Sequence, residues 1–140
     1  MNGYLLVGAV FSALASALHI GCILFGASWY RFFGAGEQMA LLAEQGSVKP
    51  TLITSFIVIV LASWSLYALS GSGFIGDMPF LRWGLCVITG IYLTRGILGF
   101  FLMARPLGRS PAFWFWSSFI CLTIGLVHLV GLAQVWSSIA

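Results

Sequence analysis

Long runs of apolar residues, separated by short polar segments, dominate the hydrophobic pattern of this chain. The runs cover residues 4–25, 51–69, 80–103 and 113–136. Each is close to the ~20 residues that an α-helix needs to cross about 30 Å of hydrocarbon. The pattern therefore predicts an all-α fold, in which residues 1–140 form a single domain of a polytopic membrane protein built as a bundle of four transmembrane helices.

The prolines lie between these runs and mark their ends. Pro50, Pro79 and Pro111 stand where the second, third and fourth runs begin. A proline is tolerated there because the first-turn N–H has no helical acceptor. Pro106 follows the third run and stops it. Because the loop between the third and fourth runs is so short, these two helices must form an antiparallel hairpin.

The first loop contains a segment, residues 37–45, in which apolar and polar positions recur at helical spacing on opposite sides. The apolar side comprises Met39, Leu42, Ala43 and Gly46. The polar side comprises Glu37, Gln38, Glu44 and Gln45. We therefore predict a short amphipathic helix that lies flat at the membrane surface, anchored by the aromatic segment 29–33.

The composition agrees with a membrane protein. The chain is 61% hydrophobic and 6% charged, whereas soluble domains carry about 25% charged residues. Its net charge of +3 arises from six cations and three acids, too few for a nucleic-acid footprint. The expected partners are the lipid bilayer and either further copies of this chain or a larger membrane complex. No nucleic acid and no cofactor is indicated.

The loop cations predict the orientation. Arg31 and Lys49 lie in the first loop and Arg105 and Arg109 in the third, whereas the opposite side carries only Arg82. Because cytoplasmic loops are enriched in Lys and Arg, the first and third loops should be cytoplasmic. Both termini should then lie outside the cytoplasm, in a cytoplasmic or inner membrane.

The chain offers little to support catalysis or metal binding. Cys22, Cys86 and Cys121 all fall within apolar runs, without a CxxC pair or a Cys/His cluster. Neither a disulfide framework nor a metal site is indicated. There is no nucleophile–base constellation and no carboxylate pair, so no catalytic residue is assigned.

Small residues line one face of the first run. Gly8, Ser12 and Ser16 recur every four residues and His19 follows them. The fourth run repeats the pattern with Ser117, Cys121, Gly125 and His128. Small side chains at this spacing let another helix approach closely. We therefore expect Gly8, Ser12, Ser16 and Gly125 to lie at helix contacts.

Arg95 is the most informative polar residue, because a central arginine costs about 2.5–3.5 kcal/mol on insertion scales. No run contains an acid to pair with it. Its candidate partners are Glu37 or Glu44 folding inward, hydroxyls, backbone carbonyls, a lipid phosphate, a bound anion or another subunit. Because helical side chains lean toward the helix N-terminus, we expect Arg95 to point toward the membrane centre rather than to snorkel to the nearer interface.

The two histidines lie at different depths. At 1.5 Å per residue, His19 lies about 7 Å and Arg95 about 5 Å to the same side of the midplane. Ser16, His19 and Arg95 are therefore the predicted ligands of an anion or lipid headgroup. His128 lies roughly 5 Å to the other side, and serves either as a proton relay or as a helix contact. This offset opposes a single haem held by both histidines of one chain.

The leading hypothesis is a small membrane protein that binds or passes a small anion or lipid headgroup near Arg95 and His19. An accessory subunit of a larger membrane complex, in which polar groups only join helices, is a second hypothesis. A membrane-embedded enzyme is a third. The sequence does not distinguish the ligand, the direction of passage or the oligomeric state.

Overall fold

The computed structural model describes all 140 residues and contains helices but no strand, which confirms the predicted all-α class. The four long helices are α1 (Gly3–Phe25), α4 (Lys49–Ser72), α5 (Leu81–Phe101) and α6 (Pro111–Val135). By length and composition, each of them can cross a membrane, with the 3-10 turn η1 (Leu102–Ala104) extending α5. The predicted runs thus match the observed helices to within a few residues.

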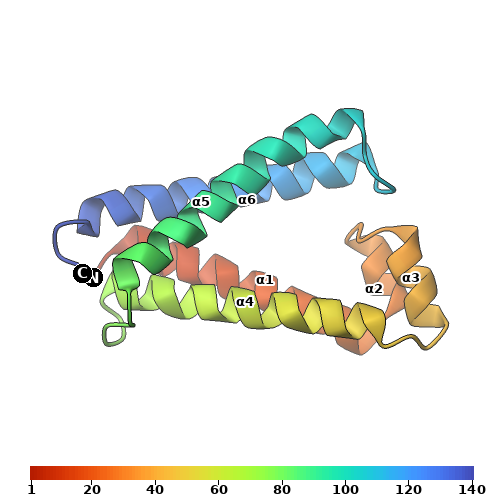
Figure 1. Cartoon of the computed structure of the whole chain (residues 1–140), viewed down its shortest axis with the longest axis horizontal. Coiled ribbons are helices and arrows are strands. Elements are labelled where there is room, and N and C mark those ends of the chain that lie inside the picture. Colours follow the sequence, from red (N-terminus) through yellow and green to blue (C-terminus); the bar gives the residue numbers. More distant parts are fainter.

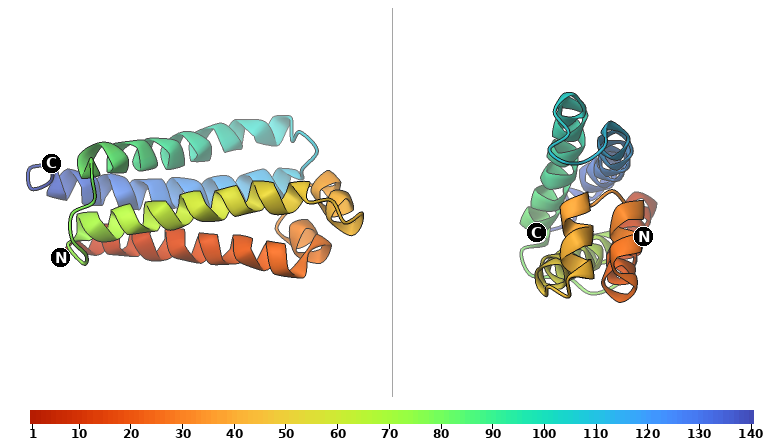
Figure 2. Two further views of the ribbon diagram at one scale, coloured as in Figure 1. Left: turned by 60° about the horizontal axis from the view of Figure 1, so that its bottom comes forward. Right: turned by 90° about the vertical axis from the view of Figure 1, so that its right-hand side faces the viewer.

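The long helices associate as two pairs. Helix α1 runs along α4, and α5 runs along α6. The pairs meet near the two chain termini, and their axes diverge toward the end that carries the short helices α2 (Ala27–Phe32) and α3 (Glu37–Glu44) (Figure 1). Figure 2 shows the same helices side by side along one axis. The backbones of α1 and α5 do not approach each other closely, but a 2.7 Å hydrogen bond between the hydroxyls of Ser12 and Tyr92 links these two helices.

Glycines set the close approach of α5 and α6. A Cβ on Gly96 would lie 2.7 Å from the backbone nitrogen of Leu122, and one on Gly125 would lie 2.8 Å from a methyl of Leu93. Neither position has space for a larger side chain, so the backbones lie in near contact. The predicted hairpin therefore packs through glycine on both helices, the mode that small residues permit between membrane helices.

Serines join α1 to α4. The Ser16 hydroxyl donates to the Val58 carbonyl at 3.0 Å, and the Ser65 hydroxyl donates to the Ala9 carbonyl at 2.8 Å. Gly8, on the same face of α1, packs instead against the imidazole of His128 in α6. Because the Ser12 hydroxyl bonds that of Tyr92 in α5, the small-residue face of α1 contacts all three other long helices.

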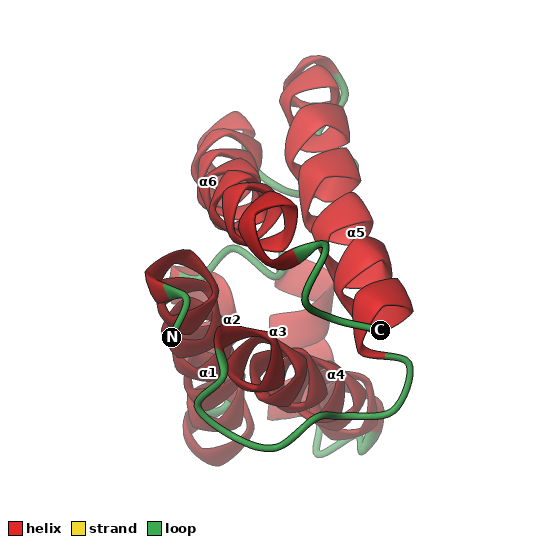
Figure 3. Ribbon diagram, turned by 90° about the vertical axis from the view of Figure 1, so that its left-hand side faces the viewer, coloured by secondary structure: helices red, strands yellow, loops and turns green.

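Both chain termini lie at one end of the bundle (Figure 3), and polar contacts tie this end together. The backbone N–H of Asn2 donates to the Ser72 carbonyl at 2.8 Å, and the side-chain amide of Asn2 donates to the side-chain oxygen of Gln134 at 2.8 Å. Arg82 donates to the Trp136 carbonyl at 2.9 Å and lies 4.6 Å over the Trp136 ring. Arg82 therefore caps the C-terminal end of α6, where free carbonyls favour a cation.

The first loop holds two helices rather than one. The predicted amphipathic helix is present as α3, but α2 lies in the aromatic segment that the sequence indicated only as an anchor. Gly26, with φ of 73°, separates α1 from α2, a backbone conformation that glycine adopts without strain. Tyr30 of α2 and Ala40 of α3 are buried together with Cys22 of α1. This small apolar cluster holds the α2–α3 pair against the end of α1.

The α2–α3 pair also reaches α6. A Cβ on Gly34 would lie 2.6 Å from the Phe113 ring, and Arg109 Nε donates to the Ala35 carbonyl at 3.2 Å. The α2–α3 connection thus contacts the loop before α6. The two helix pairs are joined at both ends, by the terminal contacts at one end and by the α2–α3 pair at the other.

Candidate anion site between α5 and α6

Arg95 projects from α5 toward the N-terminal half of α6. Its Nη2 donates to the Ser117 hydroxyl at 3.1 Å, and its Cζ lies 4.9 Å from the centroid of the Trp114 ring. The Trp114 indole N–H donates to the Pro106 carbonyl at 2.7 Å. The indole is therefore fixed against the α5–α6 loop and offers its face to the guanidinium as a cation–π partner.

The direction of the Arg95 side chain corrects the expectation that it leans toward the N-terminus of its helix. Arg95 Nη1 lies 2.5 Å from the place where a Cβ on Gly99 would stand, one turn closer to the C-terminus of α5. Because Gly99 has no side chain, this space is open to the guanidinium. Trp114 lies in the first turn of α6. Arg95 therefore extends toward the α5–α6 loop instead of the bundle centre.

Two polar atoms next to Gly99 have no partner. Arg95 Nη1 and Ser118 Oγ are both buried without a hydrogen bond, and Ser118 is 0% exposed. A Cβ on Gly99 would collide with both atoms. Buried donors without an acceptor are rare in proteins because desolvation costs free energy that only a hydrogen bond returns. The Arg95 site thus holds a positive charge and at least one unused donor.

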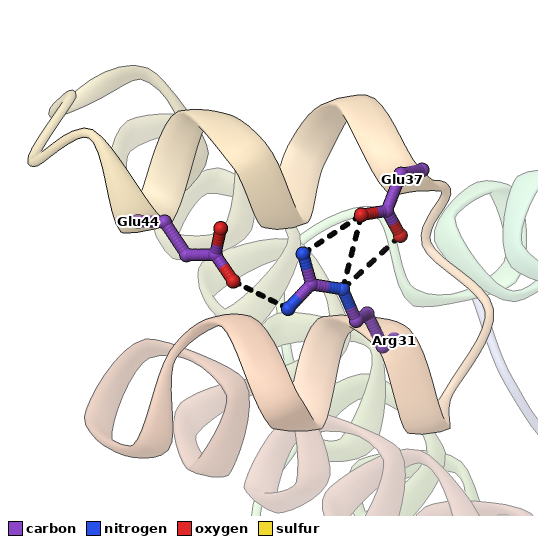
Figure 4. Close-up of polar contacts among 3 residues, drawn as sticks. All are labelled: Arg31, Glu37 and Glu44. Atoms are coloured by element: carbon purple, nitrogen blue, oxygen red, sulfur yellow. Dashed lines mark hydrogen bonds and ion pairs between the residues drawn. The ribbon is translucent and has the colours of Figure 1, made fainter.

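No carboxylate neutralises Arg95, and the structure shows why the two acids of the first loop are unavailable. Arg31 binds both of them, at 2.7 Å to Glu37 and 2.5 Å to Glu44 (Figure 4). The hydrogen bond from Arg31 lowers the pKa of Glu37, despite an opposing effect of desolvation. Neither Glu37 nor Glu44 therefore folds inward to pair with Arg95, and this candidate pairing is wrong. Asp77 lies in the α4–α5 loop, at the opposite end of α5.

The other two predicted ligands, Ser16 and His19, bond elsewhere. The Ser16 hydroxyl binds the Val58 carbonyl of α4. His19 Nδ1 lies 2.6 Å from the Ala15 carbonyl of its own helix, so this nitrogen donates the hydrogen bond. No hydrogen bond joins either residue to Arg95. A ligand role for Ser16 and His19 stays a prediction.

His128 of α6 packs against Gly8 of α1, where the two helix pairs meet, and is 0% exposed. Its Nδ1 bonds the Ile124 carbonyl at 2.8 Å, its ring lies 5.3 Å from that of Tyr92, and Nε2 has no partner. The Tyr92 hydroxyl pairs with Ser12 at 2.7 Å. His128 is thus a helix contact in this structure, and its role as a proton relay stays a prediction.

The separation of the histidines follows from their contacts. His128 packs against Gly8, and at 1.5 Å per residue the eleven-residue step from Gly8 to His19 covers about 16 Å of α1. One haem therefore cannot take both imidazoles of one chain as axial ligands. No group of three or more His, Cys, Asp or Glu side chains is placed to hold a metal ion. The three cysteines are free.

Sequence reasoning missed the groups that actually surround Arg95. The sequence pattern did not single out Trp114, and it placed Ser117 only on the small-residue face of the fourth run. Gly99 and Ser118 were not singled out. The short α5–α6 loop could have predicted the contact with Ser117. In a tight antiparallel hairpin, residues at equal distances before and after the turn lie opposite each other, and this places Arg95 near Ser117.

No protein-family model, curated protein or solved structure matches this chain. The evidence on its function is therefore the chemistry of the Arg95 site itself.

Proposed function

We propose that this protein binds a small anion, or the phosphate of a lipid headgroup, at Arg95. The observation that carries the proposal is a guanidinium on a membrane-crossing helix that has a hydroxyl and an indole as neighbours, no carboxylate, and one buried N–H group without an acceptor. A bound anion would supply both the missing charge and the missing acceptor. Both effects favour binding because the guanidinium is partly removed from water.

The guanidinium also suits this class of ligand by shape. Its planar set of N–H donors matches the paired oxygens of a phosphate or carboxylate. The Ser117 hydroxyl already orients Nη2, and Gly99 leaves Nη1 unobstructed by its own helix. Passage of the anion across the membrane would be an extension of this binding, and it is part of the same proposal.

The proposed setting is a cytoplasmic or inner membrane with both termini outside the cytoplasm. The α2–α3 pair and the α5–α6 loop would then face the cytoplasm, which places the cations Arg31, Lys49, Arg105 and Arg109 on that side. In this orientation Arg95 extends toward the cytoplasmic interface, from which a soluble anion or an inner-leaflet headgroup would reach it.

The test compares Arg95→Lys and Arg95→Gln with the wild type. Lysine keeps the charge but loses the planar fork, and glutamine keeps hydrogen-bond donors without the charge. We expect both variants to fold and to lose co-purified anionic lipid or anion flux in liposomes, by about tenfold or more for Gln. Arg105→Gln is the matched control, because Arg105 is an exposed cation of the neighbouring loop. If lipid and flux stay at the level of this control, the proposal is wrong.

The accessory-subunit hypothesis has one structural observation in its favour. Gly90, on the outer face of α5, has no atom within 4 Å of the place where a Cβ would stand. Val87 and Ile91 beside it are exposed. A small residue on an otherwise apolar outer face would let a helix of another subunit approach. Native mass spectrometry of the purified protein, with Gly90→Leu as the comparison, would reveal such an assembly.

A further inference from the structure

Arg109, in the loop before α6, has an arrangement that resembles that of Arg95. Its Cζ lies 5.3 Å from the centroid of the Phe113 ring and 5.6 Å from that of Trp114. Its Nε donates to the Ala35 carbonyl, whereas its Nη atoms make no hydrogen bond to the protein. The residue is exposed, and no carboxylate pairs with it, because the only ion pairs of the chain are those of Arg31.

Trp114 therefore brings two guanidinium groups to one indole ring, Arg95 from α5 and Arg109 from the loop. The face of an aromatic ring attracts a cation but neutralises no charge. Two like charges at one ring repel each other, and this repulsion is stronger near a membrane than in bulk water. An anion that contacts both groups would relieve the repulsion and satisfy the free N–H donors of both.

We propose that Arg95 and Arg109 together bind one phosphate group beside Trp114, the ring that both guanidinium groups contact. This inference rests on the proposed function and adds Arg109 as a second ligand. Phosphate fits better than a halide or a single carboxylate because it carries up to two charges and offers at least two free oxygens pointing in different directions. Arg109 would contact the phosphate from the aqueous side and Arg95 from the membrane side.

The level of Trp114 relative to the membrane also favours a phosphate ligand. Tryptophan is enriched at the level of lipid headgroups, and the Trp114 indole is bonded to the loop carbonyl of Pro106. A phosphate at this level belongs either to a phospholipid or to a soluble phosphate compound that enters from the adjacent aqueous phase. The shared chemistry is a phosphate group, and the two sources are separated by experiment.

The experiment measures the binding of two phosphate probes by the full-length protein in a neutral detergent. Dioctanoyl phosphatidic acid represents the lipid and inorganic phosphate the free anion, with dioctanoyl glycerol as the phosphate-free control. Wild type, Arg95→Gln, Arg109→Gln and Arg105→Gln are titrated and followed by tryptophan fluorescence and native mass spectrometry. Thermal melting of each variant verifies that it is folded.

We expect Arg109→Gln to weaken phosphate binding about tenfold or more, the usual effect of losing a charged hydrogen bond. Arg105→Gln removes the same charge from the same loop, but Arg105 contacts no ring. It should therefore change binding less than about threefold, because an isolated exposed charge contributes little. Binding of phosphatidic acid alone would identify a headgroup site, and equal binding of inorganic phosphate a site for free phosphate. Both results support the two-arginine site.

Three outcomes would overturn the inference. If Arg95→Gln weakens binding but Arg109→Gln behaves like Arg105→Gln, Arg109 is not a ligand, although the proposed function stands. If neither Arg95→Gln nor Arg109→Gln weakens binding, the proposed function fails as well. If the folded wild type binds neither phosphate probe more tightly than dioctanoyl glycerol, there is no phosphate site at Trp114.

Discussion

Gly99 decides where the side chain of Arg95 lies. An ordinary helical side chain at position 99 would occupy the space that Nη1 uses, and its Cβ would also meet the Ser118 hydroxyl. The guanidinium therefore extends along its own helix toward the loop, against the usual lean of helical side chains. The lean is a tendency of the Cα–Cβ bond, and four bonds of arginine stem are enough to reverse it where space is open.

Alanine at position 99 gives a test of this site at the scale of one residue. We expect Gly99→Ala to displace the Arg95 guanidinium and to lower anion binding about tenfold. The fold should survive, because both obstructed atoms belong to side chains that can move and because alanine favours a helix by up to about 1 kcal/mol over glycine. Binding titration and thermal melting measure the two effects.

Gly90→Ala is the matched control on the same helix. Nothing lies within 4 Å of a Cβ at this position, so alanine there should raise helix stability slightly and leave binding unchanged. Equal loss of binding in Gly90→Ala and Gly99→Ala would mean that the space next to Gly99 does not position Arg95.

At the scale of secondary-structure elements, the α2–α3 pair depends on one arginine between two acids. Arg31 of α2 bonds Glu37 in the first turn of α3 and Glu44 at its last turn. All three side chains are substantially exposed, so each pair alone contributes little. Together they hold the two short helices in one orientation, because a single guanidinium bonds carboxylates from both ends of α3 (Figure 4).

This arrangement makes the α2–α3 pair sensitive to acid. The hydrogen bond from Arg31 lowers the pKa of Glu37 below its ordinary value of 4.5. A depressed carboxyl pKa in the folded state stabilises the fold above the ordinary value, and this stabilisation is lost as the pH falls through the lowered value. We therefore expect the α3 amides to exchange hydrogen faster below about pH 4 than at pH 7, after correction for intrinsic rates.

Arg31→Gln provides the control for that prediction. It removes the partner of both carboxylates, so α3 should exchange rapidly at neutral pH and should gain little further at acid pH. Exchange in α5 and α6, which contain no acid, serves as the internal reference. An α3 protected equally at both pH values in the wild type would contradict the proposed role of Arg31.

For the whole molecule, orientation is the property that the proposed function needs most. Both termini and the α4–α5 loop lie at one end, and the α2–α3 pair and the α5–α6 loop lie at the other (Figure 1). Two positions are exposed at opposite ends, Gln38 in α3 and Gly76 in the α4–α5 loop.

Cysteine labelling in intact cells tests the orientation. In a background in which the three native cysteines are replaced, we expect Gly76→Cys to react with a membrane-impermeant reagent and Gln38→Cys to react only after the cells are opened. The physical reason is the excess of loop cations at the α2–α3 end. Labelling of Gln38→Cys from outside would reverse the orientation and place the Arg95 site at the outer interface.

The sequence by itself determined the class and the positions of the long helices. A run of about 20 apolar residues has no other stable state in hydrocarbon than a helix, and prolines at the starts of α4 and α6 mark boundaries through local chemistry alone. The amphipathic period of residues 37–45 was sufficient to predict α3 for the same reason. Each of these features depends on a residue and its near neighbours along the chain.

Only the tertiary structure decided which polar groups meet. Arg95 meets Ser117 and Trp114 because glycines bring α5 and α6 into backbone contact, whereas His19 lies on α1 and bonds the Ala15 carbonyl of its own helix. Glu37 and Glu44 bond Arg31 because two short helices fold back on each other. Such pairings depend on how helices cross and on where a missing side chain leaves space. Depth along the membrane can be counted from a sequence, but the lateral arrangement of helices at that depth depends on packing between distant residues.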